Sequence, residues 1–99
     1  MTEPNENKSK RRDKLVIMKE IIVIAMKGAS KTQIMYKANL SFSQLKRYLA
    51  LLLQRSLLEK SVRNGRVIYK STPKGIAFME KQQQIIDLLD EDSHKTGVG

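Results

Sequence analysis

Three polar side chains able to hydrogen-bond nucleic-acid bases lie within four positions of one another: Gln44, Lys46 and Arg47. Guanidinium and amide groups bond guanine or adenine through two hydrogen bonds at once, whereas a lysine ammonium suits guanine or a backbone phosphate. Arg47 and Gln44 are therefore the best candidates for base contacts, and Lys46 fits either role. These side chains can act together only if one element presents them on an open face, as a helix would.

Two signals of the same form predict where helices begin, Ser30-Lys-Thr-Gln33 and Ser41-Phe-Ser-Gln44. In each, the Ser hydroxyl accepts a hydrogen bond from the amide three residues on, and the Gln side chain reaches back to the Ser amide. With Asn39-Leu40 between them, they predict a short helix over residues 31–38, a tight turn and a second helix over 42–55. This outline is a helix-turn-helix, and it indicates DNA binding.

Apolar spacing predicts which sides of these two helices face a core. The residues expected to point inward are Ile34, Met35 and Ala38 on the first helix, and Phe42, Leu45, Leu49 and Leu52 on the second. Tyr48 borders the second stripe, so a core position is favoured for it. Tyr36 fits a backbone contact or the edge of the core equally well.

The basic residues are concentrated in the middle of the chain. The formal net charge is +9, and the stretch from Lys27 to Lys74 holds eleven Lys or Arg against one acid, Glu59. The stretch from Glu80 to Asp92 has the opposite balance, with five acids and one base. This distribution predicts a polyanion-binding surface that faces away from the C-terminal segment. The alternative is that the charge only aids solubility.

A β-hairpin is predicted after the second helix. Arg63-Asn64-Gly65 separates two β-prone runs, residues 57–62 and 66–70. Asn-Gly is a strong hairpin signal because both residues tolerate the positive φ of a type I′ turn. Arg63 and Arg66 flank the tip, so residues 62–67 would form a basic wing along phosphates or in the minor groove.

Two further helices are predicted, over residues 13–26 and 73–89. Asp13 is the expected N-cap of the first and Lys27-Gly28 its stop, while Thr72-Pro73 opens the second. Both helices are apolar over a wider arc than one small core covers. We therefore expect a homodimer in which these terminal helices pack against a second copy.

The distinctive runs of the chain are Gly28-Ala29, KTQIMYKANLS at 31–41, LKRYL at 45–49, Leu57-Leu58, Tyr69 and Thr72-Pro73-Lys74-Gly75. On these runs the chain resembles the archaeal winged helix-turn-helix regulators and small chromatin-type DNA-binding proteins, from about residue 12 to residue 89. The resemblance implies a mainly α fold with a small β-hairpin, double-stranded DNA binding, and dimers formed through terminal helices, sometimes as a coiled coil. Two features depart from the family: Ser56 stands where Gly is frequent, and the last helix is short for a long coiled coil.

The expected organisation is a disordered basic tail over residues 1–11, a winged-helix domain over 12–90 and a disordered tail over 91–99. A basic cluster at residues 8–14, at the end of the N-terminal tail, could lie along a phosphate backbone. The chain has no Cys, no apolar run long enough for a membrane span and no signal-peptide pattern at its N-terminus. We therefore expect a cytoplasmic, nucleoid-associated protein.

The helix 42–55 is expected to enter the major groove, and the helix starts and the wing to contact phosphates. The predicted DNA-contacting residues are Ser30, Lys31, Thr32, Lys37, Ser41, Ser43, Gln44, Lys46, Arg47, Arg63, Asn64 and Arg66. Neither an enzyme nor a metal site is expected. The only His, His94, lies in the tail, and the sequence indicates no general base that could activate a Ser as a nucleophile. No cofactor and no small-molecule ligand is predicted.

Two alternatives stay open. Winged helices also serve as protein-protein interaction modules, and the wide apolar arcs of the terminal helices would suit that role. RNA binding is a third reading, although two Phe and three Tyr, several of them expected in the core, leave few platforms for stacking single-stranded bases.

Overall fold

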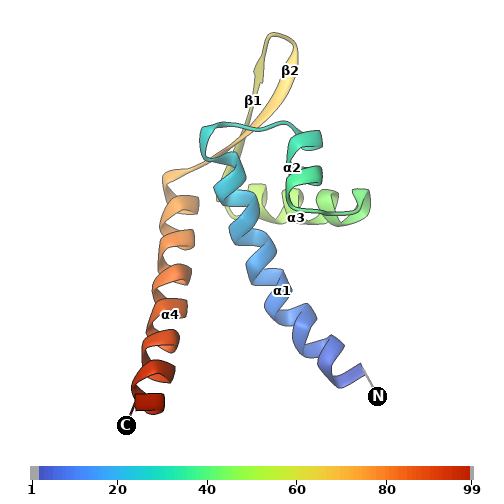
Figure 1. Ribbon diagram of the computed structural model, residues 1–99. Helices are drawn as coiled ribbons and strands as arrows, with labels where there is room; N and C mark the ends of the chain where they lie inside the picture. Colours follow the sequence, from blue (N-terminus) through green and yellow to red (C-terminus); the bar gives the residue numbers. More distant parts are fainter. Residues whose placement is uncertain (1–2, 99) are drawn as a thin grey trace.

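The computed structural model describes the backbone of residues 3–98 and the side chains of residues 14–90. Within that range the chain is mainly helical, with a two-stranded antiparallel sheet. The elements in order are α1 (Glu3–Ile24), the 3₁₀ turn η1 (Ala25–Lys27), α2 (Lys31–Lys37), α3 (Phe42–Gln54), β1 (Leu58–Arg63), β2 (Arg66–Ser71) and α4 (Pro73–Val98). Figure 1 shows the hairpin at one end and α1 and α4 descending from it. The predicted winged-helix order is confirmed.

α1 begins earlier than predicted. Asp13, the expected N-cap, lies inside the helix, which starts at Glu3. The sequence there suits a helix start, because Pro4 is tolerated in the first turn and acids such as Glu6 are favourable near an N-terminus. The predicted stop is confirmed, since η1 tightens the last turn and Gly28 ends it with a φ of 94°.

The helical bounds of α1 and α4 include most of the two segments predicted as disordered tails, residues 1–11 and 91–99. The side chains of those segments lie outside the described part of the chain. Disorder at the two ends therefore stays a prediction.

Both predicted capping boxes are present. Ser30 Oγ accepts a hydrogen bond from the Gln33 amide at 3.2 Å, and Gln33 Oε1 accepts one from the Ser30 amide at 3.0 Å. Ser41 and Gln44 are joined by the same pair of bonds at the same distances. These bonds satisfy amides that the first turn of a helix leaves free, so they determine where α2 and α3 begin.

α2 and α3 also end alike, each in a Schellman motif. The residue after each helix cap is left-handed, Asn39 with a φ of 56° and Ser56 with a φ of 61°. The following amides, those of Leu40 and Leu57, donate to carbonyls five residues back at 2.9 and 2.8 Å. Both leucines are buried, so each motif reverses the chain and returns an apolar side chain to the core.

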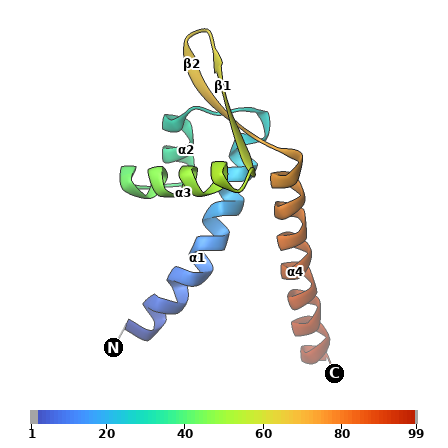
Figure 2. The ribbon, with the colours of Figure 1, turned by 180° about the vertical axis from the view of Figure 1, so that it is seen from behind.

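The hairpin turns at Asn64-Gly65, with φ values of 50° and 75°, as a type I′ turn requires. At its base, Ala29 and Tyr69 exchange two backbone hydrogen bonds of 2.9 and 2.8 Å. These bonds connect β2 to the segment between η1 and α2. Figure 2 shows the hairpin projecting beyond α2 and α3, which leaves its tip open to a partner.

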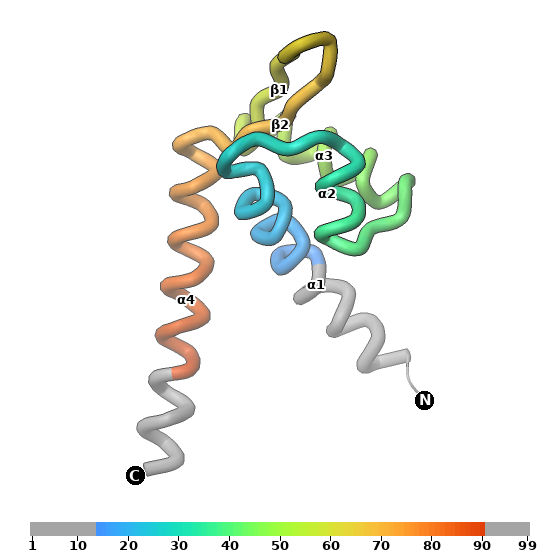
Figure 3. Tube along the Cα trace, turned by 45° about the horizontal axis from the view of Figure 1, so that its top comes forward, coloured from blue at the N-terminus to red at the C-terminus, as the bar shows by residue number. Residues whose placement is uncertain are grey.

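α1 lies between α4 and the pair formed by α2 and α3 (Figure 3), and most of the core gathers around it. The buried apolar side chains are Met18, Ile21, Ile22, Ala25, Ala29, Ile34, Ala38, Leu40, Leu45, Leu49, Leu52, Leu57, Leu58 and Tyr69. Met35 and Tyr48 are half-buried and pack against this core. The predicted inward positions are therefore confirmed, with the exception of Phe42.

α4 begins against the end of α3. The Thr72 hydroxyl accepts from the Gly75 amide at 2.9 Å and donates to the Ser56 carbonyl at 2.6 Å, so Thr72 is the predicted N-cap. The Lys74 ammonium donates to the Arg55 carbonyl at 2.9 Å. A cation at this position is favourable, because the C-terminal end of a helix carries partial negative charge.

Apolar side chains of the terminal helices remain uncovered in a single copy. Those that are exposed are Leu15, Val16 and Val23 of α1, Met26 of η1, and Ile85, Leu88 and Leu89 of α4. α1 and α4 diverge toward the two chain ends (Figures 1 and 2), so neither covers the far part of the other. Among the described residues, no helix has the combined length and apolar content that crossing a membrane requires.

Candidate nucleic-acid interface

The open face of α3 carries three of the predicted contact residues. The buried leucines of the inner face fix the rotation of the helix about its axis. Ser43, Lys46 and Arg47 are exposed, and their spacing places them away from the leucine stripe. The helix therefore presents one hydroxyl and two cations to solvent near its N-terminal end.

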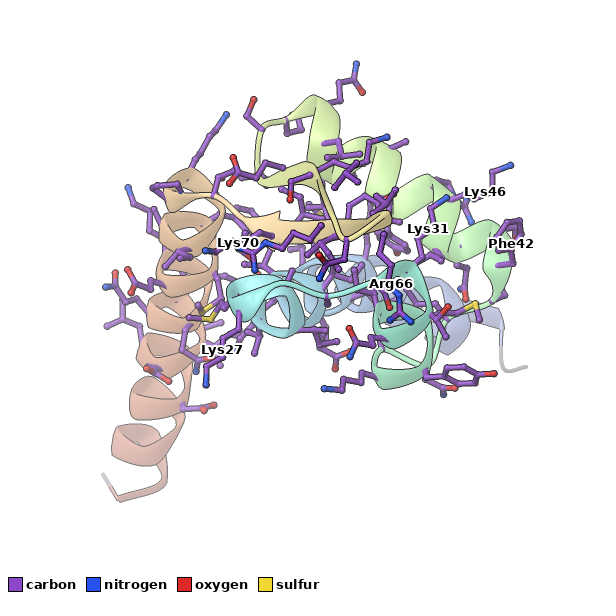
Figure 4. All side chains as sticks on the ribbon, turned by 90° about the horizontal axis from the view of Figure 1, so that it is seen from above. Lys27, Lys31, Phe42, Lys46, Arg66 and Lys70 are labelled. Carbon is purple, nitrogen blue, oxygen red and sulfur yellow. The ribbon has the colours of Figure 1, made fainter. Side chains whose placement is uncertain are left out.

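Phe42 differs from its prediction. Helical spacing groups it with the buried leucines, yet 61% of its surface is exposed. It is the first residue of α3 and lies one turn before Leu45, past the edge of the core. The Lys46 ammonium lies 5.6 Å from the centre of the Phe42 ring, within the range of a cation–π contact. Figure 4 shows both side chains projecting from the same end of α3.

Gln44 is already engaged by the fold. Its Oε1 accepts the Ser41 amide at 3.0 Å and its side chain is half-buried. A paired contact with adenine needs both the oxygen and the nitrogen of the amide. The structure therefore favours Gln44 as a capping residue, and leaves Arg47 as the stronger candidate for reading a base.

The cap serines differ in how free their hydroxyl protons are. Both hydroxyl oxygens accept an amide hydrogen bond. The Ser30 O–H proton stays available to a phosphate oxygen, whereas Ser41 Oγ also lies 3.4 Å from Ser43 Oγ, and either hydroxyl of that pair can be the donor. Lys31 and Thr32 are exposed in the first turn of α2, and Lys37 is exposed in its last turn. Tyr36 is 75% exposed, which favours a contact role over the edge of the core.

Basic hollows border the wing. One of about 670 Å³ lies between β2 and the start of α2, and its polar lining includes Ser30, Lys31, Thr32, Lys60 and Arg66. A second, of about 540 Å³, lies between the wing and η1 and is lined by Lys27, Gly28, Arg63, Asn64, Arg66 and Ile68. Figure 4 shows Lys27, Lys31, Arg66 and Lys70 around the hairpin. Arg66 is thus brought close to the start of α2, and Arg63 and Asn64 are brought close to η1.

Lys27 and Lys60 were missed as candidates for this interface. Lys27 attracts attention in the sequence only as a helix-stop signal. Lys60 is opposite the buried Tyr69 in the hairpin, so its side chain projects from the same face as Tyr69, and it is nevertheless exposed. Strand alternation groups Lys60 with the buried Leu58, so alternation does not identify Lys60 as an exposed cation.

A third hollow, of about 600 Å³, lies between α1 and α3. It is lined by Lys14, Gln44, Arg47, Tyr48 and Leu51. The structure therefore brings Lys14, the last member of the predicted basic cluster, beside Arg47. The other members, residues 8–12, have side chains outside the described part of the chain.

The chemistry of the site is that of a cationic surface. From Lys27 to Lys74 the only acid is Glu59. Within the described residues, no group of three or more His, Asp or Glu side chains is placed to hold a metal ion. Exposed cations and hydroxyls on α2, α3 and the wing can bind phosphates and base edges.

The sequence and the fold both match known proteins. Residues 11–90 fit the model of a family described as winged helix-turn-helix. An uncharacterized protein of Methanocaldococcus jannaschii is 35% identical over 85 residues, which are 85% of this chain and 38% of that protein. The chain thus spans well under half the length of this relative.

Solved structures with the same fold have low sequence identity. Sso10a-2, a DNA-binding protein from Sulfolobus solfataricus, has a TM-score of 0.67 and 24% identity, over 84% of this chain and 90% of that one. ZitR of Lactococcus lactis has a TM-score of 0.64 and 15% identity, over 81% and 58%. Reduced HlyU of Vibrio cholerae has a TM-score of 0.53 and 21% identity, over 86% and 97%.

Proposed function

The chain belongs to the winged helix-turn-helix family, and we propose that it binds double-stranded DNA as a homodimeric transcriptional regulator or chromatin-type protein. The observation that carries the proposal is the exposed, almost acid-free surface formed by α3, the start of α2 and the wing. Sso10a-2 supports it as a DNA-binding protein of the same fold. Binding to chromosomal DNA would place the protein with the nucleoid in the cytoplasm.

In this proposal α3 enters the major groove, where base edges present distinct donors and acceptors. Arg47 bonds a guanine, and Lys46 bonds a neighbouring base or phosphate. The hydroxyls of Ser30, Ser41 and Ser43 and the cations at the ends of α2 contact phosphates. Residues 62–67 of the wing lie along the next phosphates or in the minor groove.

Two substitutions separate base reading from phosphate contact. Arg47→Ala should weaken binding to a preferred duplex by about 1–3 kcal/mol and relax sequence preference. Arg63→Ala should weaken binding to all duplexes alike, and reduce the slope of log affinity against log salt by about one. Fluorescence anisotropy over a range of salt concentrations measures both effects.

Lys81→Ala is the matched control, because it removes one exposed cation from α4 and not from α2, α3 or the wing. It should leave affinity and salt slope nearly unchanged. Tight binding that is insensitive to salt and to both arginine substitutions would contradict DNA binding through this surface.

The homodimer forms through α1 and α4, whose exposed apolar side chains lack a cover in one copy. Light scattering should give twice the mass of one chain. Ile85→Asp should shift the protein toward monomers because it places a charge on this surface, whereas Gln84→Asp, at the neighbouring exposed position, should not. A wild-type monomer would instead favour the second candidate, an interaction module that covers these helices with a different protein.

A further inference from the structure

Phe42 is an apolar residue on a polar surface. It is 61% exposed and lies at the start of the helix whose exposed neighbours are Ser43, Lys46 and Arg47. A single exposed apolar side chain is ordinary on a protein surface and has no meaning alone. Here its position is specific, because the N-terminal residues of a recognition helix are those that approach base edges.

The major groove offers one apolar group to such a side chain. Each base pair presents hydrogen-bonding groups there, and thymine adds its C5-methyl group, which contacts apolar side chains such as Phe. We propose that Phe42 contacts the C5-methyl group of a thymine and makes the protein prefer thymine at that position. This inference rests on the proposed DNA binding and adds a specificity-determining residue to it.

Lys46 supports this role through its position over the ring. Its ammonium lies 5.6 Å from the ring centre, and both side chains project from the same end of α3 (Figure 4). The cation–π contact restrains two side chains that would otherwise move freely. Phe42 and Lys46 therefore act as a pair. The ring contacts the thymine methyl group, and the ammonium binds an adjacent base acceptor or a DNA phosphate.

Tyr36 provides the comparison within the chain. It is more exposed than Phe42, at 75%, but it lies near the end of α2 and carries a hydroxyl. An aromatic residue outside α3 is suited to a phosphate contact rather than to a base edge. Tyr36→Ala is therefore a matched control for Phe42→Ala.

The test removes the methyl group from the DNA and the ring from the protein. A duplex selected from random sequences for tight binding is resynthesised with deoxyuridine in place of thymidine at one position at a time, so that only the C5-methyl group is lost. At one position, wild-type affinity should fall about fourfold, as expected for one buried methyl group. Phe42→Ala should bind the two duplexes equally, whereas Phe42→Leu and Tyr36→Ala should retain the difference.

Equal binding of thymidine and deoxyuridine duplexes by the wild type at every position would overturn the inference. So would a difference that persists in Phe42→Ala or disappears in Tyr36→Ala. Wild-type protein that binds no duplex in the salt titration would contradict the proposed function itself, which the deoxyuridine comparison does not test. Because Phe42 is exposed, thermal unfolding of Phe42→Ala should match wild type, which separates lost contact from lost fold.

Discussion

Ser56→Gly should stabilise the protein. Ser56 is left-handed, with a φ of 61°, and this conformation costs an L-residue about 1–2 kcal/mol relative to glycine. The Ser56 side chain takes no part in the bonds that hold the turn. The Ser56 amide donates to the Leu53 carbonyl at 3.0 Å, and the Ser56 carbonyl accepts from the Thr72 hydroxyl. Glycine keeps both bonds but makes the unfolded chain more flexible, which costs about 0.4–1 kcal/mol. The net gain is about 0.5–1 kcal/mol, or about 2–8 °C in Tm for a domain of this size.

Calorimetry and urea unfolding at one fixed protein concentration measure this gain, since a dimer makes stability depend on concentration. Ser61→Gly is the control: the same chemical change at an exposed position of β1, where φ is not positive. It should destabilise by about 0.5–1 kcal/mol. If Ser56→Gly is no more stable than the wild type, or if both substitutions shift stability in the same direction, the explanation from backbone strain is refuted.

Two further predictions concern packing and pH. Gly75→Ala should cost about 2–3 kcal/mol in urea unfolding, because the new Cβ would lie 2.2 Å from the Leu57 carbonyl oxygen. Gly65→Ala, whose Cβ meets nothing within 4 Å but whose φ is +75°, should cost only about 1 kcal/mol. Burial raises the pKa of Tyr69 above its ordinary value of 10.0, so the folded state holds this proton more tightly and stability falls as pH rises above about 10. Tyr69→Phe should lose less stability than wild type between pH 9 and 11.

The parts of the fold that follow from the sequence are set by hydrogen bonds within three or four residues. The two capping boxes, the Asn64-Gly65 turn and the Thr72 cap each need only neighbouring residues, and all are present. The positions of the charged residues also predict which face of α3 is exposed to solvent. Local chemistry was therefore sufficient for the element order, and the choice of α3 as recognition helix stays a prediction.

The features of the site that could not be predicted from the sequence depend on the packing between elements. Phe42 continues the apolar stripe of α3 by spacing, but among the side chains described, residues 14–90, none covers most of its surface. Lys60 becomes part of the basic hollow only through the register of the hairpin. In the sequence, Gln44 is suited both to a contact with a base and to capping α3. The hydrogen bond that its Oε1 accepts from the Ser41 amide favours the capping role.

The junction of α3 and α4 connects the proposed groove-binding and dimer-forming elements. Thr72 precedes α4 and Lys74 lies in its first turn. The Thr72 hydroxyl donates to the Ser56 carbonyl and the Lys74 ammonium to the Arg55 carbonyl, just after the end of α3. In a dimer formed through α4, these bonds would set the angle between each recognition helix and the dimer axis. The distance between the two recognition helices would then depend on this junction, and half-sites in DNA must match that distance. The left-handed turn at Ser56 is part of the same junction, so Ser56→Gly changes the flexibility of the connection as well as its strain.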